Sequence, residues 1–492
     1  MNHTGEFLKC LYRNFFTYIR FWDTVMDMKL LNLVVENHRS FRDEFHLELT
    51  RPHFTSNIPD SRESWAENVF PVIAIYGANA SGKTTVIDAV KYLWSALSAS
   101  SGEWLNRATV PHEPFLLGEA REHPSAYSID FTLDADYSQA NPTPGETRFH
   151  YEFDVTPQGF GHELLQVYRS SRATTLLSRE QSEDGVKLKL AAGLGGKFEV
   201  THRELALSRA GMTGRGQLGV IAQKIRDGLV IIGVDDEERN LRLHRITEEL
   251  DKGTIHLDDF SALAQASDFG IQKIDVDIQK LPNDIAKRLR TIMRALESDA
   301  PEHVASTELP KREHSEKETH ELIQRSLQFT HKTIHSDAPQ PKFGINDQSS
   351  GTLAWLALAI PMVEVLRHGT VLCVDELSSS LHPKLAAEIV RVFQTPELNP
   401  HHAQLIFSTH DVSLLMPQAE LNLQPGQIWF TEKEIDGASE LYSLRDFPDI
   451  RGGTNIAKQF MEDRYGATPR VIPELISKIA LHGAHEGSGA LM

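Results

Sequence analysis

Gly77-Ala-Asn-Ala-Ser-Gly82-Lys83-Thr84 is the stretch that decides the fold of this 492-residue chain. It matches the pattern G-x-x-x-x-G-K-[ST] in full, it follows the apolar run 71–76, and a helical pattern to about Ala99 comes after it. A phosphate-binding loop requires this context, because its glycines let backbone N–H groups turn inward and the helix N-terminus adds a favourable dipole. The predicted ligand-binding residues are Gly77, Asn79, Ser81, Gly82, Lys83, Thr84 and Thr85.

A second apolar segment, Val371-Leu-Cys-Val374, ends in two carboxylates, Asp375 and Glu376. Strands of a parallel sheet present their C-terminal ends to the ligand crevice, so these carboxylates are expected beside the glycine loop. Lys83 can then reach the β- and γ-phosphates, while Thr84 and Asp375 are the predicted magnesium ligands. Glu376 is placed to polarise a water for attack on the γ-phosphate, a role worth about 10²–10⁴-fold in rate.

Three further motifs resemble those of ABC-type ATPases. Asp347-Gln-Ser349-Ser-Gly351-Thr352 opens an apolar helix and resembles the signature motif in its Ser-x-Gly form. Leu377-Ser-Ser-Ser-Leu-His382-Pro383 resembles the D-loop, and Ile406-Phe-Ser-Thr-His410-Asp411 is a strand that ends in His410 and resembles the segment of the switch histidine. The signature departs from that of transporters, which have Gly and Gln where this chain has Ser350 and Thr352. Candidates for the Q-loop glutamine are Gln139, Gln158 and Gln166.

Finer features resemble one branch of the ABC, SMC and RecF ATPases. Asn37-His-Arg-Ser-Phe41 is similar to the Asn-Phe-Arg-Ser-Phe of OLD-like and RecF-like ATPases, with His38 as the departure. Residues 426–433 and 464–469 resemble the closing segments of the RloA/AbiL-type ATPases of bacterial phage defence, to which the ATPase subunits of PARIS systems are related. The resemblance covers about residues 28–470 and is loosest over 170–327.

This resemblance implies an α/β fold, with an ABC-ATPase-like P-loop core, a mixed sheet and a mainly helical insertion that splits the core. It also implies an ATPase that uses ATP and Mg²⁺ and forms ADP and phosphate. In this superfamily ATP lies between two subunits. One would supply the glycine loop, Asp375, Glu376 and His410, and the other would supply Ser349 and Gly351, so a homodimer or higher homo-oligomer is expected.

The function implied by the resemblance is a switch subunit of a two-component phage-defence system. Its expected partners are a nuclease-like effector protein encoded nearby and a phage-derived trigger protein. The alternative is a DNA-clamping repair ATPase of the RecF/SMC type, for which DNA would be the partner. The ATPase subunit of an ABC transporter is disfavoured, because many more residues separate Lys83 from Ser349 in the sequence than in a compact transporter domain.

The amino-acid composition argues against several classes of function. Lys and Arg number 50 and Asp and Glu 68, so the formal net charge of −18 argues against a protein that coats nucleic acid with a broad basic surface. Two cysteines exclude a disulfide framework and a Cys-rich zinc module, which favours a cytoplasmic protein. No uninterrupted apolar stretch reaches the roughly 20 residues of a spanning helix, so no membrane span is expected. We interpret the pairs His401/His402 and His331/His335 as surface or core residues rather than metal ligands. The basic residues of the insertion are interpreted as a solvated helix face, and the acidic segment 432–436 as a turn between strands.

The predicted divisions are an N-terminal extension 1–27, a first half of the ATPase core 28–169, an insertion 170–327, a second core half 328–450 and a C-terminal segment 451–492. Residues 1–27 carry a helical apolar stripe, which fits either an amphipathic docking helix or an upstream start codon before Met28. Within the first core half, residues 126–170 alternate around turn residues and predict an antiparallel sheet. Residues 285–296 and 316–327 are expected to be helical.

Overall fold

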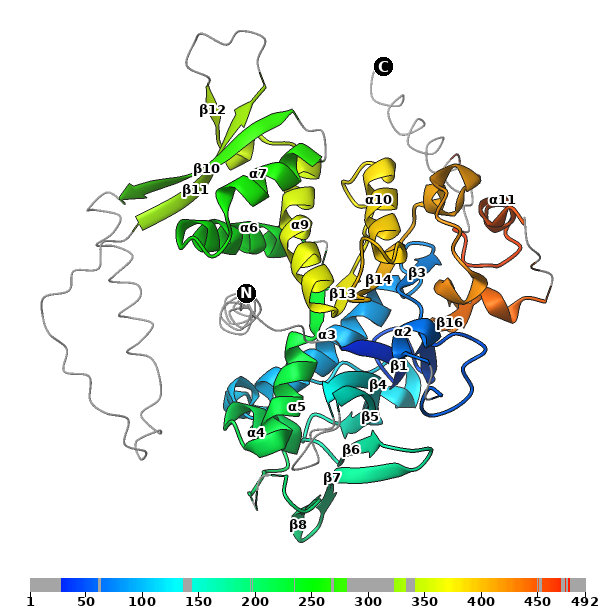
Figure 1. Ribbon diagram of the computed structural model, residues 1–492. Helices are drawn as coiled ribbons and strands as arrows, with labels where there is room; N and C mark the ends of the chain where they lie inside the picture. Colours follow the sequence, from blue (N-terminus) through cyan, green and yellow to red (C-terminus); the bar gives the residue numbers. More distant parts are fainter. Residues whose placement is uncertain are drawn as a thin grey trace, which may run out of the picture. The chain divides into compact units, whose positions relative to one another are not determined.

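The computed structural model describes residues 28–60, 63–135, 144–194, 196, 198–233, 235–266, 270–280, 323–332, 341–448, 450, 454–469, 474 and 477. The chain divides into two compact units, Met1–Val234 with Pro361–Met492, and Asp235–Ile360. Figure 1 shows the elements of both. The predicted amphipathic stripe of residues 1–27 lies outside the described residues, as does the predicted helix 285–296.

A mixed six-stranded sheet carries the glycine loop. Its strand order is β16-β15-β3-β14-β13-β9, and every pairing is parallel except that of β15 with β16. The strands are β3 (Val72–Gly77), β9 (Leu229–Ile232), β13 (Val371–Val374), β14 (Gln404–Thr409), β15 (Ile428–Lys433) and β16 (Ser439–Ser443). The central strands β3, β13 and β14 are buried along their whole length, and their sequences are mostly apolar, although β14 also buries Gln404, Ser408 and Thr409.

Helices follow the strands of this sheet as the sequence predicts. α3 (Lys83–Ala99) begins directly after the glycine loop, and α10 (Pro383–Gln394) begins with Pro383 at a position where a missing N–H costs nothing. α9 (Ser350–His368) precedes β13. The first unit also contains the short helices α2 (Trp65–Asn68) and α11 (Ile456–Met461).

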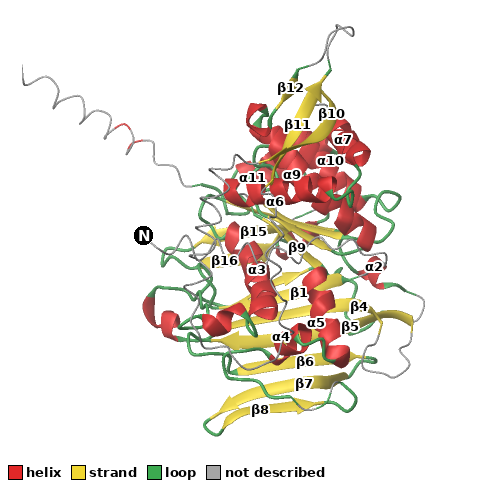
Figure 2. Ribbon diagram, turned by 90° about the vertical axis from the view of Figure 1, so that its left-hand side faces the viewer, coloured by secondary structure: helices red, strands yellow, loops and turns green. Residues whose placement is uncertain are grey.

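The second sheet of this unit is antiparallel and seven-stranded, in the order β2-β1-β4-β5-β6-β7-β8. Its strands are β1 (Lys29–Glu36), β2 (Phe45–Glu48), β4 (Ser125–Ala135), β5 (Pro144–Val155), β6 (His162–Tyr168), β7 (Ala173–Ser182) and β8 (Gly185–Leu190). Alternate residues such as Tyr127, Phe149 and Tyr151 turn into the core, where α3, α4 (Ala206–Met212) and α5 (Gly216–Asp227) cover this face of the sheet (Figure 2). The antiparallel sheet predicted over 126–170 is confirmed.

The second unit combines helices with a small sheet. α6 (Asp236–Asp251) and α7 (Leu257–Ala266) accompany the antiparallel strands β10 (Ile271–Lys280), β11 (Ile323–His331) and β12 (Lys342–Phe343). The indole Nε1 of Trp355, on α9, donates to the carbonyl oxygen of Leu263 at 2.9 Å and ties α9 to the segment of α7.

The predicted α/β fold with a mixed sheet is confirmed, whereas the contents of the segment 170–327 differ from the expectation. Strands β7, β8 and β9 fall in this segment and pair within the two sheets of the first unit, so the second unit begins only at Asp235. The helix expected over 316–327 is wrong for its described part, because residues from Ile323 form β11. Strand pairing with β10 overrides the local helical pattern there.

One described helix, α9, is long and apolar enough by length and composition to cross a membrane. Core helices of soluble proteins can meet the same criterion of length and composition.

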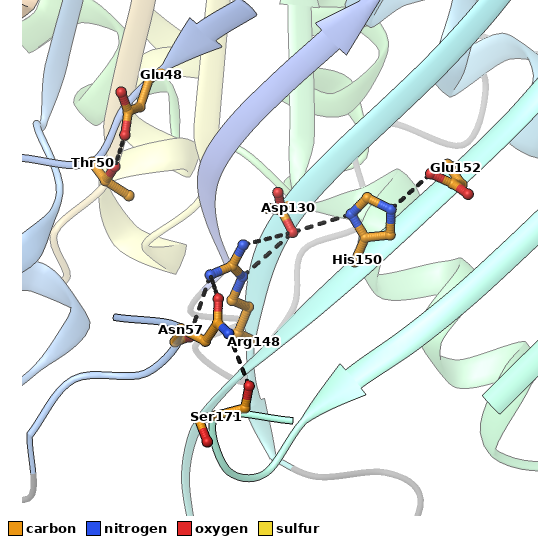
Figure 3. Close-up of polar contacts among 8 residues, drawn as sticks. All are labelled: Glu48, Thr50, Asn57, Asp130, Arg148, His150, Glu152 and Ser171. Atoms are coloured by element: carbon orange, nitrogen blue, oxygen red, sulfur yellow. Dashed lines mark hydrogen bonds and ion pairs between the residues drawn. The ribbon is translucent and has the colours of Figure 1, made fainter. Parts of the chain in front are cut away.

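A polar network covers part of the outward face of the seven-stranded sheet (Figure 3). Asp130 on β4 accepts from Arg148 and His150 on β5, and the other ring nitrogen of His150 lies 2.9 Å from Glu152. Burial by itself would lower the pKa of His150, but its hydrogen bonds to Asp130 and Glu152 raise that pKa to about 9. The imidazolium therefore stabilises the folded sheet across neutral pH.

We predict that His150→Gln lowers the thermal midpoint at pH 7, because about 1–2 kcal/mol of charge-assisted hydrogen bonding is lost. A raised pKa contributes stability that is complete below the ordinary value of 6.5 and is lost as the pH rises through about 9. The difference from the wild type should therefore shrink toward pH 10 in a thermal melt series. His46→Gln, at an exposed histidine of β2, is the control; a difference for His150→Gln that does not vary with pH would contradict the prediction.

Candidate nucleotide-binding site

The glycine loop turns between β3 and α3 as its sequence requires. Gly82, the N-cap residue of α3, has φ of +115° and Ala80 has φ of +63°, so the backbone turns through the left-handed region twice. A Cβ atom on Gly77 would lie 2.4 Å from Thr431 Oγ1 and 2.6 Å from Thr431 O. The first turn of α3 has backbone N–H groups without partners inside the helix, which suits an anion.

Lys83 lies with its ammonium over this loop. Its Nζ donates to the carbonyl oxygens of Gly77 and Ala78 at 2.9 Å each, and the residue is only 5% exposed. Burial lowers the pKa of Lys83, and the carboxylates of Glu376 and Asp375 oppose that effect. The cation is therefore held beside two carboxylates at the point where the phosphates of a nucleotide would lie.

The two predicted magnesium ligands meet directly. Thr84 Oγ1 donates to Asp375 Oδ2 at 2.9 Å, although β13 and β3 are separated in the sheet by β14. Ser408, at the end of β14, donates to the other oxygen, Asp375 Oδ1, at 2.5 Å. A hydroxyl beside a carboxylate is a hard oxygen pair that fits Mg²⁺, which needs only one or two carboxylates when phosphates complete its shell.

Glu376 follows Asp375 in a strained backbone conformation. Its φ is +49°, which is uncommon for a residue other than glycine, and its N–H donates to Ser408 Oγ at 2.7 Å. The residue is half-buried and its carboxylate is close enough to Lys83 to affect the pKa of that ammonium. Strain of this kind persists where the surrounding structure holds it, and it is frequent at functional sites.

The end of β14 carries the remaining predicted residue of this unit. His410 is exposed immediately after the strand. On either side of it, Thr409 Oγ1 bonds to Ser378 Oγ at 2.6 Å and Asp411 caps the short turn Val412–Leu415 by accepting from the N–H of Ser413. The structure thus brings His410 to the same sheet edge as Asp375 and Glu376.

The segment 37–41 packs beside α3. Ser40 Oγ lies 3.1 Å from Thr85 Oγ1, and Arg39 pairs with Asp88 on α3. His38 is fully buried and bonds to the Tyr127 hydroxyl at 2.9 Å. Burial, then the nearby Arg39, lowers the pKa of His38 to about 3, so the ring is neutral at pH 7.

Ser349 and Gly351 lie in the second unit, at the start of α9. Ser349 Oγ accepts from the N–H of Thr352 at 3.1 Å and so caps the start of α9. Gln166 bonds to Thr175 between β6 and β7, Gln158 lies in the turn between β5 and β6, and Gln139 lies outside the described residues. Among the described residues, no group of three His, Cys, Asp or Glu side chains is placed to hold a metal ion.

Residues 72–206 and 214–416 match the family described as "AAA domain, putative AbiEii toxin, Type IV TA system". The chain belongs to this family. The matched residues include the glycine loop, Asp375, Glu376 and His410, so the candidate site lies within the AAA domain that the family describes. No protein with a curated description matches it.

Several solved structures are similar to this AAA-family chain. An SMC head bound to the C-winged helix domain of ScpA is 14% identical, with a TM-score of 0.38 over 84% of this chain and 97% of that one. The SMC head domain from Thermotoga maritima is 12% identical, with a TM-score of 0.34 over 84% and 98%. An SMC head with an extended coiled coil, bound to a ScpA domain from Pyrococcus furiosus, is 14% identical, with a TM-score of 0.36 over 89% and 99%.

Sequence reasoning missed three hydroxyls that contact the site of this AAA-family protein. Thr431 on β15 lies against Gly77 and bonds to Ser81 Oγ at 2.6 Å, and Ser439 on β16 lies against Gly82. Ser408 joins Asp375 to Glu376. Hydroxyl side chains within strands give no local sequence signal of which distant residues they contact.

We predict that Thr431→Val weakens nucleotide binding about 3–10-fold, because the buried hydroxyl that fixes Ser81 and the loop is lost at a cost of about 1 kcal/mol. Thr431→Ser keeps the hydroxyl and is the matched control. Isothermal titration with ADP would measure both. Equal affinities for the valine and serine variants would contradict a role for the hydroxyl.

Proposed function

We propose that this chain is the ATP-binding and ATP-hydrolysing switch subunit of a two-component bacterial phage-defence system. In this proposal, it controls a separate nuclease-like effector protein through ATP-dependent interfaces between copies of itself. The observation that carries the ATPase part is the convergence of the glycine loop, the Thr84–Asp375 pair and Glu376 at one sheet edge.

The residues divide the proposed work as follows. The loop N–H groups and Lys83 bind the β- and γ-phosphates of ATP, while Thr84 and Asp375 hold Mg²⁺, which supplies charge neutralisation at the phosphate oxygens when bound. Glu376 accepts a proton from a water whose oxygen attacks the γ-phosphorus. The bond from that phosphorus to the bridging oxygen breaks, and ADP leaves with phosphate. His410 would contact the γ-phosphate from the end of β14.

A second copy of the chain completes the site in this proposal. Ser349 and Gly351 begin α9, a helix whose N-terminal N–H groups and capping hydroxyl are suited to a γ-phosphate. Because one chain carries one set of motifs, the signature residues of each copy would serve the nucleotide of the other. Hydrolysis removes the γ-phosphate contacts and would release that interface.

The biological part of the proposal is supported by the family. Its description names a putative toxin and a type IV TA system, which supports the proposal of a two-component system. The formal net charge of −18 suits contact with a basic partner and disfavours the alternative, a DNA-clamping ATPase of the RecF/SMC type.

We predict that Glu376→Gln binds ATP with nearly unchanged affinity, hydrolyses it at least about 100-fold more slowly and accumulates as a larger oligomer.

Lys83→Ala should fail to bind or hydrolyse ATP, and Ser349→Arg should bind ATP without assembling. Phosphate release and light scattering after size exclusion would measure these effects. Wild-type turnover of Glu376→Gln would remove Glu376 as the base, and loss of ATP binding in Ser349→Arg would place Ser349 in the site of its own copy.

The two-component proposal is tested by expressing the chain with and without its neighbouring gene during phage challenge. We expect protection only from the pair, with Lys83→Ala and Glu376→Gln abolishing it, and co-purification of the neighbour's product with the chain. Toxicity of the chain expressed alone would make it the toxin rather than the switch. Salt-dependent DNA affinity or DNA-stimulated ATPase activity would favour the DNA-clamping alternative.

A further inference from the structure

Ser408 contacts the first three residues of the turn that follows β13. Its Oγ donates to Asp375 Oδ1 at 2.5 Å and accepts from the N–H of Glu376 at 2.7 Å, and its carbonyl oxygen accepts from the N–H of Leu377 at 3.0 Å. Ser408 is fully buried. A residue of β14 thus fixes both the carboxylate proposed to hold Mg²⁺ and the backbone of the proposed base.

Only a hydroxyl suits both contacts of this side chain. One partner is a carboxylate, which needs a donor, and the other is an N–H, which needs an acceptor; a hydroxyl is both at once. Removing it would leave Asp375 Oδ1 and the N–H of Glu376 without this partner in a buried place, and a group left in that way costs more than the bond itself.

The position of Glu376 explains why this contact matters for chemistry. Its φ of +49° is unfavourable for a glutamate, so the turn needs to be held from outside. β9 holds the preceding peptide, because the N–H of Asp375 donates to Ile232 O at 2.9 Å, and Ser408 holds the following two. The direction of the Glu376 side chain is therefore set from β14.

We propose that Ser408 is a positioning residue of the proposed ATPase, which turns Asp375 Oδ2 toward Thr84 and keeps Glu376 in its left-handed conformation. The inference rests on the proposed function. It predicts that Ser408 affects the steps that need Mg²⁺ and the attacking water, and leaves the binding of nucleotide phosphates by the glycine loop intact.

The experiment compares Ser408→Ala and Ser408→Thr with Ser443→Ala. Ser443 is the matched control because it is also fully buried in the six-stranded sheet and also donates one hydrogen bond, to Pro425 O, and accepts one, from Arg445 N. Its contacts are to backbone groups away from Asp375. Each variant is assayed for binding of a fluorescent ATP analogue, in EDTA and across a Mg²⁺ titration, and for kcat and KM.

In Ser408→Ala we expect the Mg²⁺ concentration for half-maximal enhancement of binding to rise about 10-fold or more, and kcat to fall about 10–100-fold. Affinity in EDTA should change less than about 2-fold, Ser408→Thr should recover most of the Mg²⁺ response, and Ser443→Ala should resemble the wild type. An unchanged Mg²⁺ response in Ser408→Ala, or equal effects of Ser408→Ala and Ser443→Ala, would overturn the positioning role.

Failure of this inference is distinct from failure of the proposed function. A wild-type protein that binds the nucleotide without hydrolysing it would refute the ATPase proposal, while the Mg²⁺ titration would still test Ser408. If Ser408→Thr does not fold because its extra methyl group has no room, thermal melting will show it, and the alanine pair decides the result.

Discussion

The hydrogen bond between Thr84 and Asp375 joins residues 291 positions apart, and the first unit is arranged so that it can form. Thr84 follows β3, Asp375 follows β13, and β14 lies between these strands and adds Ser408. Because the three strands are parallel, their C-terminal ends share one edge of the sheet. The apolar residues of α3 pack with those of both sheets, which fixes the helix end that presents Thr84.

The parts of this arrangement with strong local patterns could be predicted from the sequence. The helix expected from Lys83 to about Ala99 has those bounds, and the strands before Asp375 and His410 are in place. The two strands are predicted by their apolar residues, because the local preference of such residues agrees with burial in a parallel sheet. The antiparallel sheet was predictable because its strands alternate between core and solvent.

Other parts depend on pairings between distant segments. β9 has only four residues, and nothing local shows that it pairs with β13. Thr431, Ser439 and Ser408 lie on three different strands, and their closeness to the glycine loop or to Asp375 arises from sheet order. The burial of His38 is likewise set by tertiary packing, which keeps its ring neutral at pH 7.

The pairing of β9 with β13 also places side by side the two strands nearest the covalent connections to the second unit. The chain leaves the first unit three residues after Ile232, the end of β9, and returns through α9 into Val371, the start of β13. Both covalent connections to the second unit are therefore attached to two adjacent, hydrogen-bonded strands. The backbone of the second unit is thus continuous at both ends with the strand pair that leads to Asp375.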